Sequence, residues 1–270
     1  MERTTETRLS AVSAFWAVLV RPRRLFTAIA EGHHRGWWLA ALVIIVATVL
    51  PIVVAAPIMA REAREAFLRM QEEMQRNMPP GAAPPDVEQA AQFISSPLFT
   101  VIFPAAGMTV AQVLGWLIWA GALYLLALVF GGRVAFGRMF QVTVWASIPE
   151  AVRGLVQTLY ITLTGQLIRN PGLSGLIETP APDLSTAMTD PVVMDPQTAA
   201  LRQLLQTVDI FLFWQLALLI LGMAVLTKFS LRRSAVLVIL VWAVFTALSL
   251  VPTLVSQWFL MSAMGTTVSP

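Results

Sequence analysis

Five long apolar segments alternate with polar stretches along this chain of 270 residues. Each approaches or exceeds the roughly 20 residues that a helix needs to cross the hydrocarbon core of a bilayer. The first two hold no Asp, Glu, Lys or Arg. The segments cover residues 37–59, 99–130, 142–164, 210–226 and 234–258. This pattern predicts an all-α integral membrane protein, a bundle of five transmembrane helices with an N-terminal interfacial segment.

Composition agrees with this class of protein. Hydrophobic residues make up 57% of the chain and charged residues 12%, and mean hydropathy is +0.73, whereas soluble domains hold roughly 25% charged residues. Five spans leave no room for a separate soluble domain of ordinary size. The predicted organisation is a basic cytoplasmic segment (1–36), a membrane domain (37–260) with outer loops near 60–98 and 165–208, and a short tail (261–270).

The distribution of Arg and Lys predicts the topology. These residues outnumber Asp and Glu before the first span, between the second and third spans, and between the fourth and fifth. Basic loops stay on the cytoplasmic side, which predicts a multi-pass protein of the cell (inner) membrane with a cytoplasmic N-terminus and an outside C-terminus. The net charge is only +3, so we expect the lipid bilayer, and no nucleic acid, as the partner of the basic loops.

Apolar residues are interspersed with arginines between residues 11 and 36, which is typical of a segment at the membrane surface. Arg21, Arg23 and Arg24 are expected to contact anionic headgroups. Pro22 would interrupt any single helix there. A tether without special structure is the alternative interpretation, because arginine runs are common beside membrane helices.

Two helical patterns extend outside the spans. Residues 59–78 place apolar side chains on one face and alternating Glu and Arg on the other, so the first helix should continue beyond the membrane. Prolines in 77–85 then prevent further helix. Asp195 and Pro196 form a favourable helix start, which predicts a helix leading straight into the fourth span.

One face of the third predicted span is polar. Polar residues recur there at alternating intervals of three and four, which places them on one side of a helix. This candidate intramembrane polar face consists of Glu150, Arg153, Gln157, Tyr160 and Thr164. Charged residues are costly in hydrocarbon, and two interpretations are open. Either the face lines a polar cavity, an ion path or a lipid-headgroup site, or it is structural, with both charges near the cytoplasmic end and the rest bonded to neighbouring helices. We favour the second, because one acid and one arginine make a sparse relay.

Proline and small residues predict details of helix geometry. Pro149 is expected to kink or start the third helix. In the second span, Gly107, Ala111 and Gly115 fall four residues apart, and small residues at this spacing let two helices approach closely. We expect helix packing within the chain, and a homodimer seam is the alternative.

The sequence holds no arrangement typical of catalysis. Its two histidines, His33 and His34, are adjacent in the basic N-terminal segment, which gives neither an HExxH zinc motif nor the base of a serine triad. Cysteine is absent, and acidic residues do not cluster at metal-ligand spacing within the spans. We therefore expect a non-enzymatic protein with no catalytic residue, no metal and no cofactor.

Three short motifs carry a family resemblance. They are Pro22, Leu25, Phe26 and Ile29 before the first span, Ala146-Ser147-Ile148-Pro149 at the third, and Trp214, Leu218 and Gly222 in the fourth. With the five-span, N-inside arrangement, they resemble the prokaryotic branch of the Yip1 domain family. The resemblance implies that these residues are structural. Eukaryotic members associate with Rab-type GTPases, a role not expected here because the N-terminal cytosolic region is too short for a folded partner-binding domain.

Two functions from different classes fit these observations. The favoured one is a Yip1-like membrane-organising or scaffold component that binds lipid and forms a homo-oligomer or contacts another membrane protein. The alternative is a small transporter, permease subunit or channel with a polar path along the third transmembrane helix.

Overall fold

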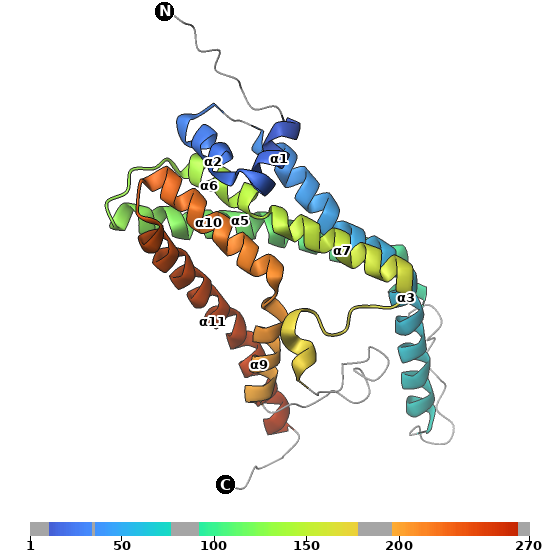
Figure 1. Ribbon diagram of the computed structural model, residues 1–270. Helices are drawn as coiled ribbons and strands as arrows, with labels where there is room; N and C mark the ends of the chain where they lie inside the picture. Colours follow the sequence, from blue (N-terminus) through green and yellow to red (C-terminus); the bar gives the residue numbers. More distant parts are fainter. Residues whose placement is uncertain (1–10, 34–35, 77–91, 178–195, 264–270) are drawn as a thin grey trace, which may run out of the picture. The chain divides into compact units, whose positions relative to one another are not determined.

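A computed structural model (Figure 1) describes residues 11–33, 36–76, 92–177 and 196–263. Every element within these ranges is a helix. In chain order they are α1 (Ala11–Val20), α2 (Pro22–Glu31), α3 (Trp37–Arg76), η1 (Leu98–Ile102), α5 (Phe103–Val129), α6 (Phe136–Ala146), α7 (Ile148–Thr164), η2 (Gly172–Leu176), α9 (Pro196–Thr207), α10 (Ile210–Thr227) and α11 (Leu231–Ala263). The proline-rich stretch 77–85 and residues 264–270 of the predicted tail lie outside the described residues.

Four helical stretches of the described chain are long and apolar enough to span a membrane. They are Trp37–Glu72, Leu98–Val129, Ile210–Thr227 and Leu231–Phe259. The expected all-α membrane class is confirmed, but the count of five spanning helices is wrong. The third predicted span, 142–164, is divided between α6 and α7, and α7 alone has 17 residues, or about 26 Å of helix.

The division of the third span occurs at Ser147. Proline has no backbone N–H and fits the first turn of a helix, and Pro149 is the second residue of α7. The Glu150 amide donates to the Ser147 carbonyl at 2.9 Å, while the Ser147 amide donates back to the Thr143 and Val144 carbonyls at 3.2 and 3.1 Å. α6 therefore ends and α7 begins within three residues. The hydrophobicity of the sequence alone does not reveal this boundary.

Other helix boundaries also follow from proline. α1 ends at Val20 and α2 begins at Pro22, so the interruption expected there is present. η1 is a π-helical turn that ends two residues before Pro104, and the Phe103 amide donates to the Leu98 carbonyl five residues back. α3 continues to Arg76, as predicted for the extension beyond the membrane, and α9 begins at Pro196. α9 does not run straight into the fourth span, because two residues separate it from α10.

The chain divides into two compact units, each made of discontinuous segments. Unit 1 comprises Met1–Thr48, Thr109–Gly154 and Ile210–Thr246, and unit 2 comprises Val49–Met108, Leu155–Asp209 and Ala247–Pro270. The core of unit 1 is formed where α2 and α6 pack against α10. Trp145 of α6 is fully buried there, with its ring 5.0 Å from that of Phe15 of α1. The N-terminal helices are thus part of the folded unit.

Within unit 2, η2 packs against α9, and polar contacts join α9 to the C-terminal half of α11. The Gln203 side-chain amide donates to the Ser249 carbonyl at 2.9 Å, and the Thr253 hydroxyl donates to the Gln203 side-chain oxygen. Arg202, only 5% exposed, donates to Asn170 Oδ1 at 3.1 Å. The bond from Arg202 therefore joins α9 to the loop 165–170, and the bonds of Gln203 join α9 to α11.

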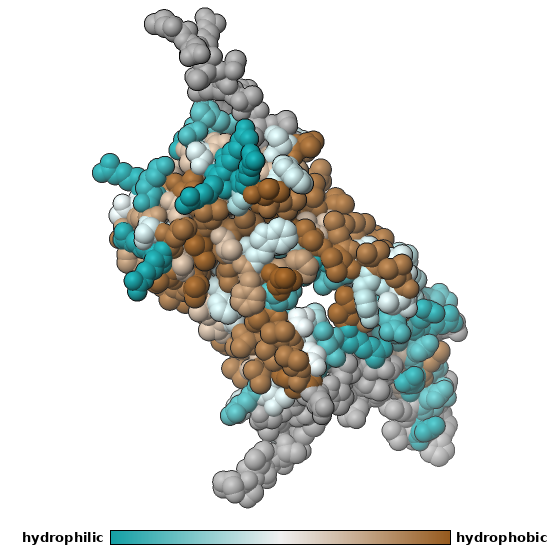
Figure 2. Space-filling view, in the orientation of Figure 1, coloured by the Kyte–Doolittle hydropathy of each residue, from teal (hydrophilic) through white to brown (hydrophobic). Residues whose placement is uncertain are grey.

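Figure 2 shows how polarity is distributed over unit 1. Hydrophilic residues gather over α2 and over the turns that follow α5 and α10, and hydrophobic residues cover the helix surfaces next to them. Exposed apolar side chains on α5 and α11 include Leu125 (60%) and Val236 (61%). Such a surface suits hydrocarbon.

Candidate polar site in the membrane region

The break between α6 and α7 places a polar side chain at the centre of unit 1. Ser147 is 1% exposed. Its hydroxyl donates to the Thr143 carbonyl at 3.1 Å and accepts hydrogen bonds from Trp116 Nε1 at 3.1 Å and Gln215 Nε2 at 3.3 Å. A hydroxyl has one hydrogen to donate and two lone pairs, so all of its bonding capacity is used.

Glu150 follows Ser147 by three residues, in the first turn of α7. Its carboxyl group is held by side-chain amides from two other helices. Its Oε2 accepts from Gln112 Nε2 of α5 at 2.7 Å, and its Oε1 accepts from Gln215 Nε2 of α10 at 2.8 Å. The position in the first turn of α7 also suits an acidic side chain, because the N-terminal end of a helix carries partial positive charge. One carboxyl group thereby joins three helices.

The five residues of this polar cluster are Gln112, Trp116, Ser147, Glu150 and Gln215. Sequence reasoning singled out only one of them, Glu150, as a candidate. A usable signal existed for one pair, because Gln112 and Trp116 are four residues apart and share a face of α5. What the sequence lacked was the knowledge that this face meets Ser147 and Glu150.

The rest of the predicted polar face lies in two environments. The Arg153 guanidinium, also in unit 1, stands 5.7 Å from the centroid of the Phe211 ring, a cation–π distance. Gln157, Tyr160 and Thr164 belong to unit 2. Gln157 is half-buried, and the exposed Thr164 hydroxyl donates to the Tyr160 carbonyl of its own helix at 2.8 Å.

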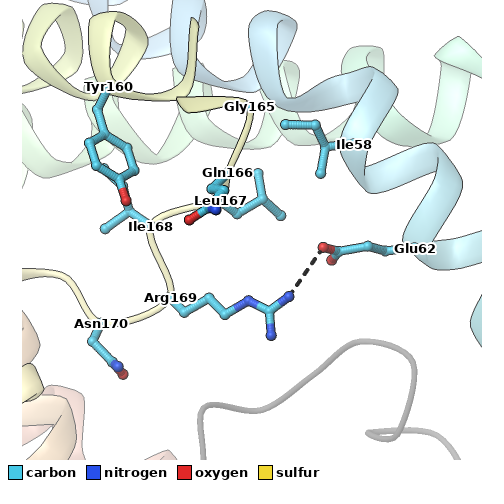
Figure 3. Close-up of a pocket in the computed structure, with 9 residues that line it drawn as sticks. All are labelled: Ile58, Glu62, Tyr160, Gly165, Gln166, Leu167, Ile168, Arg169 and Asn170. Carbon is cyan, nitrogen blue, oxygen red and sulfur yellow. Dashed lines mark hydrogen bonds and ion pairs between the residues drawn. The ribbon is translucent and has the colours of Figure 1, made fainter. Parts of the chain in front are cut away.

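Unit 2 contains a cavity of about 610 Å³, lined by α3, the end of α7 and the loop 165–170. Figure 3 shows Arg169 reaching from this loop toward Glu62 of α3, with Nη2 of Arg169 3.4 Å from Oε1 of Glu62. Tyr160 lines the same cavity and is 42% exposed. Arg169 and Glu62 are the two charged residues of this lining, and their charges offset each other.

The N-terminal arginines are placed where lipid or solvent can reach them. Arg21, Arg23 and Arg24 are all exposed, whereas Leu25 and Phe26 of the same helix are fully buried against the protein. α2 therefore presents a cationic surface from a fixed position.

The packing within the chain expected at Gly107, Ala111 and Gly115 stays a prediction, as does the alternative of a homodimer seam. Gly107 and Ala111 are exposed, and a Cβ built on Gly107 or Gly115 meets no atom within 4 Å. Helices approach closely at two other glycines: a Cβ on Gly154 would overlap the Ala47 carbonyl, and one on Gly222 would overlap the Val142 side chain.

No group of three or more His, Cys, Asp or Glu side chains suited to a metal ion occurs among the described residues. The fold and the apolar helices define an integral, multi-pass membrane protein in contact with the lipid bilayer. The profile of the Yip1 domain matches residues 16–263, and the chain belongs to the Yip1 domain family. No curated protein and no solved structure matches the chain.

Proposed function

We propose that the protein is a non-enzymatic membrane-organising or scaffold component that binds lipid through its N-terminal helices. The observation that carries this proposal is that α2 packs into the core of unit 1. Leu25, Phe26 and Ile29 are at most 1% exposed, so α2 cannot leave the surface without exposing them to water. The exposed arginines of this helix are therefore held as a permanent part of the membrane domain.

α1 supports the same role through its apolar exposure. Val12 is 81% exposed and Trp16 66% exposed, and tryptophan is favoured at the headgroup level. A pair of helices fixed at this level displaces lipid in one leaflet, and such interfacial helices respond to curvature and lipid composition. We infer that α1 and α2 bias the packing of the cytoplasmic leaflet around the protein.

We place the protein in the cell (inner) membrane, with its N-terminus on the cytoplasmic side and its C-terminus on the outer side. The ends of α5 and α10 lie together, because Arg233 donates to the Phe130 carbonyl at 2.7 Å and its guanidinium stands 4.1 Å from the Phe229 ring centroid. Two spanning helices that end side by side run parallel, so the chain between them must recross the membrane. We assign that crossing to α6 and α7 together, a divided pair of helices in addition to the four helices long enough to span by themselves.

The charges of unit 1 favour this orientation. Arg138, near the start of α6, donates to the Ala30 carbonyl of α2 at 2.5 Å, which joins the first two basic stretches. Arg233 joins the second to the third. All three share one end of the unit, and the positive-inside rule makes that end cytoplasmic. A periplasmic-activity reporter fused after residue 270 should be active, and a silent reporter would contradict the assignment.

The experiment that tests the organising role is purification in lipid nanodiscs followed by native mass spectrometry. A monomer or homo-oligomer that carries only lipid is expected. Co-purification of an ATPase subunit would contradict the proposal and support a permease, the alternative function.

A flux assay separates the same two functions. If α7 lined an ion path, Glu150→Gln or Gln157→Leu in liposomes would abolish a flux of protons or other cations while the protein remained folded. We expect no flux to be lost, because both carboxyl oxygens of Glu150 are occupied by amides from α5 and α10. A flux that disappears in either folded variant would refute the structural interpretation of the polar face.

A further inference from the structure

Cationic side chains surround a cavity of about 460 Å³ in unit 1, between α2, the turn after α5, and the end of α10. Arg133, Arg138 and Lys228 line it, together with one carboxylate, that of Glu31. Three positive charges and one negative charge leave a net charge of +2. The volume lies within the roughly 300–1,000 Å³ typical of small-ligand sites.

Two of these cations are available to a ligand. Arg138 is engaged by the Ala30 carbonyl at 2.5 Å. Arg133 and Lys228, by contrast, are exposed and have no hydrogen-bond or ion-pair partner in the part of the chain that the structure describes. The Thr27 side chain lines the cavity as well and carries a hydroxyl donor.

The backbone of Lys228 supplies an independent observation. Lys228 follows the last residue of α10 with φ +63°, the one positive φ of a non-glycine residue in the described ranges. Glycine is the usual residue at such a helix end, because a Cβ is strained there. The turn after α5 follows that rule with Gly131, at φ +81°. Lys228 is also the single lysine of a chain that otherwise uses arginine.

The cavity lies next to the ends of two spanning helices. Its lining includes residues 131, 133, 227 and 228, all within four residues of the ends of the spanning helices α5 and α10. Helices that fill the hydrocarbon core end close to the phosphate layer. Basic pockets between helices on the cytoplasmic side are suited to anionic headgroups.

We propose that this cavity binds one phosphate group, presented by an anionic lipid headgroup or as free phosphate, with Lys228 and Arg133 as its principal ligands. The phosphate has tetrahedral oxygens that accept from the ammonium, the guanidinium and the Thr27 hydroxyl together. This site goes beyond the proposed organising role, because a bound phosphate requires only that the protein sits in a membrane.

The test is Lys228→Gly in the full chain, placed in nanodiscs of phosphatidylcholine with a minor fraction of phosphatidylglycerol. A cation near an anionic membrane surface contributes about 1 kcal/mol, so we expect phosphatidylglycerol retained in native mass spectra to fall about five-fold or more. The thermal unfolding midpoint should stay the same or rise, because glycine relieves the positive φ. The two measurements therefore distinguish a loss of lipid binding from a loss of folding.

Arg232→Gly is the matched control. It removes the same charge from an exposed residue at the start of α11 that does not line the cavity, and it should keep phosphatidylglycerol close to the wild-type amount. Unchanged retention in Lys228→Gly, an equal loss in Arg232→Gly, or an equal loss of phosphatidylcholine would each overturn the proposal.

Inorganic phosphate distinguishes the source. If inorganic phosphate displaces phosphatidylglycerol from the wild-type protein but causes no additional loss from Lys228→Gly, the site accepts free phosphate. Retention of phosphatidylglycerol under the same conditions, combined with its loss in Lys228→Gly, supports a site specific for the lipid headgroup.

Discussion

Replacing Gln215 by leucine tests whether the polar cluster holds the helices of unit 1 together. The Gln215 amide donates to Glu150 Oε1 at 2.8 Å and to the Ser147 hydroxyl at 3.3 Å. Leucine removes both hydrogen bonds and still fills much of the space with apolar atoms. Glu150 would then retain the bond from Gln112 on α5, and the polar connection from α10 to α7 would be lost.

The expected magnitude follows from the two bonds that are removed. Hydrogen bonds between membrane helices contribute about 0.6 kcal/mol on average and at most about 1.7 kcal/mol, so two of them amount to about 1–3 kcal/mol. The upper half of this range is expected, because one acceptor is a carboxyl group. For a chain of this size, each kcal/mol corresponds to about 2–4 °C, so a loss of about 2–3 kcal/mol lowers the thermal midpoint by about 4–12 °C.

The assay is thermal unfolding of the wild type and the variant in the same detergent and lipid. Gln75→Leu is the matched control, since Gln75 is an exposed residue of α3 without a hydrogen-bond partner in the described chain, and its midpoint should not change. If Gln215→Leu unfolds at the same temperature as Gln75→Leu, the cluster does not stabilise the fold, and the structural interpretation of Glu150 fails with it.

The remaining predictions concern helix contact. Gly154→Ala should lower the free energy of unfolding by about 3 kcal/mol or more, and the thermal midpoint with it, because the new methyl group would overlap the backbone carbonyl of Ala47, which cannot rotate away. Gly222→Ala should cost less, since it meets the Val142 side chain, and adding Val142→Ala should restore part of the stability. Thermal unfolding measures both, and an unchanged midpoint in either glycine variant would contradict the close approach.

The sequence predicted those features that depend on local pattern. Apolar length identified the membrane helices, the alternation of Glu and Arg predicted the extension of α3 to Arg76, and Pro22 marked the boundary between α1 and α2. Each of these signals lies within a few turns of helix. The wrong count of spanning helices has the same origin, because residues 142–164 are apolar enough to resemble one helix although Ser147 and Pro149 divide them.

Contacts between distant segments could not be predicted in this way. Gln112 and Gln215 reach Glu150 across 38 and 65 residues, and in the sequence each is only an isolated polar residue in an apolar helix. The glycines show the same limit. Gly154 approaches the Ala47 carbonyl closely, although no regular spacing of glycines in the sequence around it predicts this contact. Periodicity defines a face, and only the fold determines what covers it.

The separation of Glu150 from its second donor also sets an order of events during synthesis. Gln112 is already made when Glu150 emerges, but Gln215 follows 65 residues later, roughly 3–13 s at ordinary translation rates. If α6 and α7 form the proposed crossing, α7 with its two charged residues enters the membrane beside α5 before its last partner exists. Packing around Glu150 is then completed only when α10 arrives, and a nascent chain stopped before Gln215 should leave this helix exposed to membrane quality control.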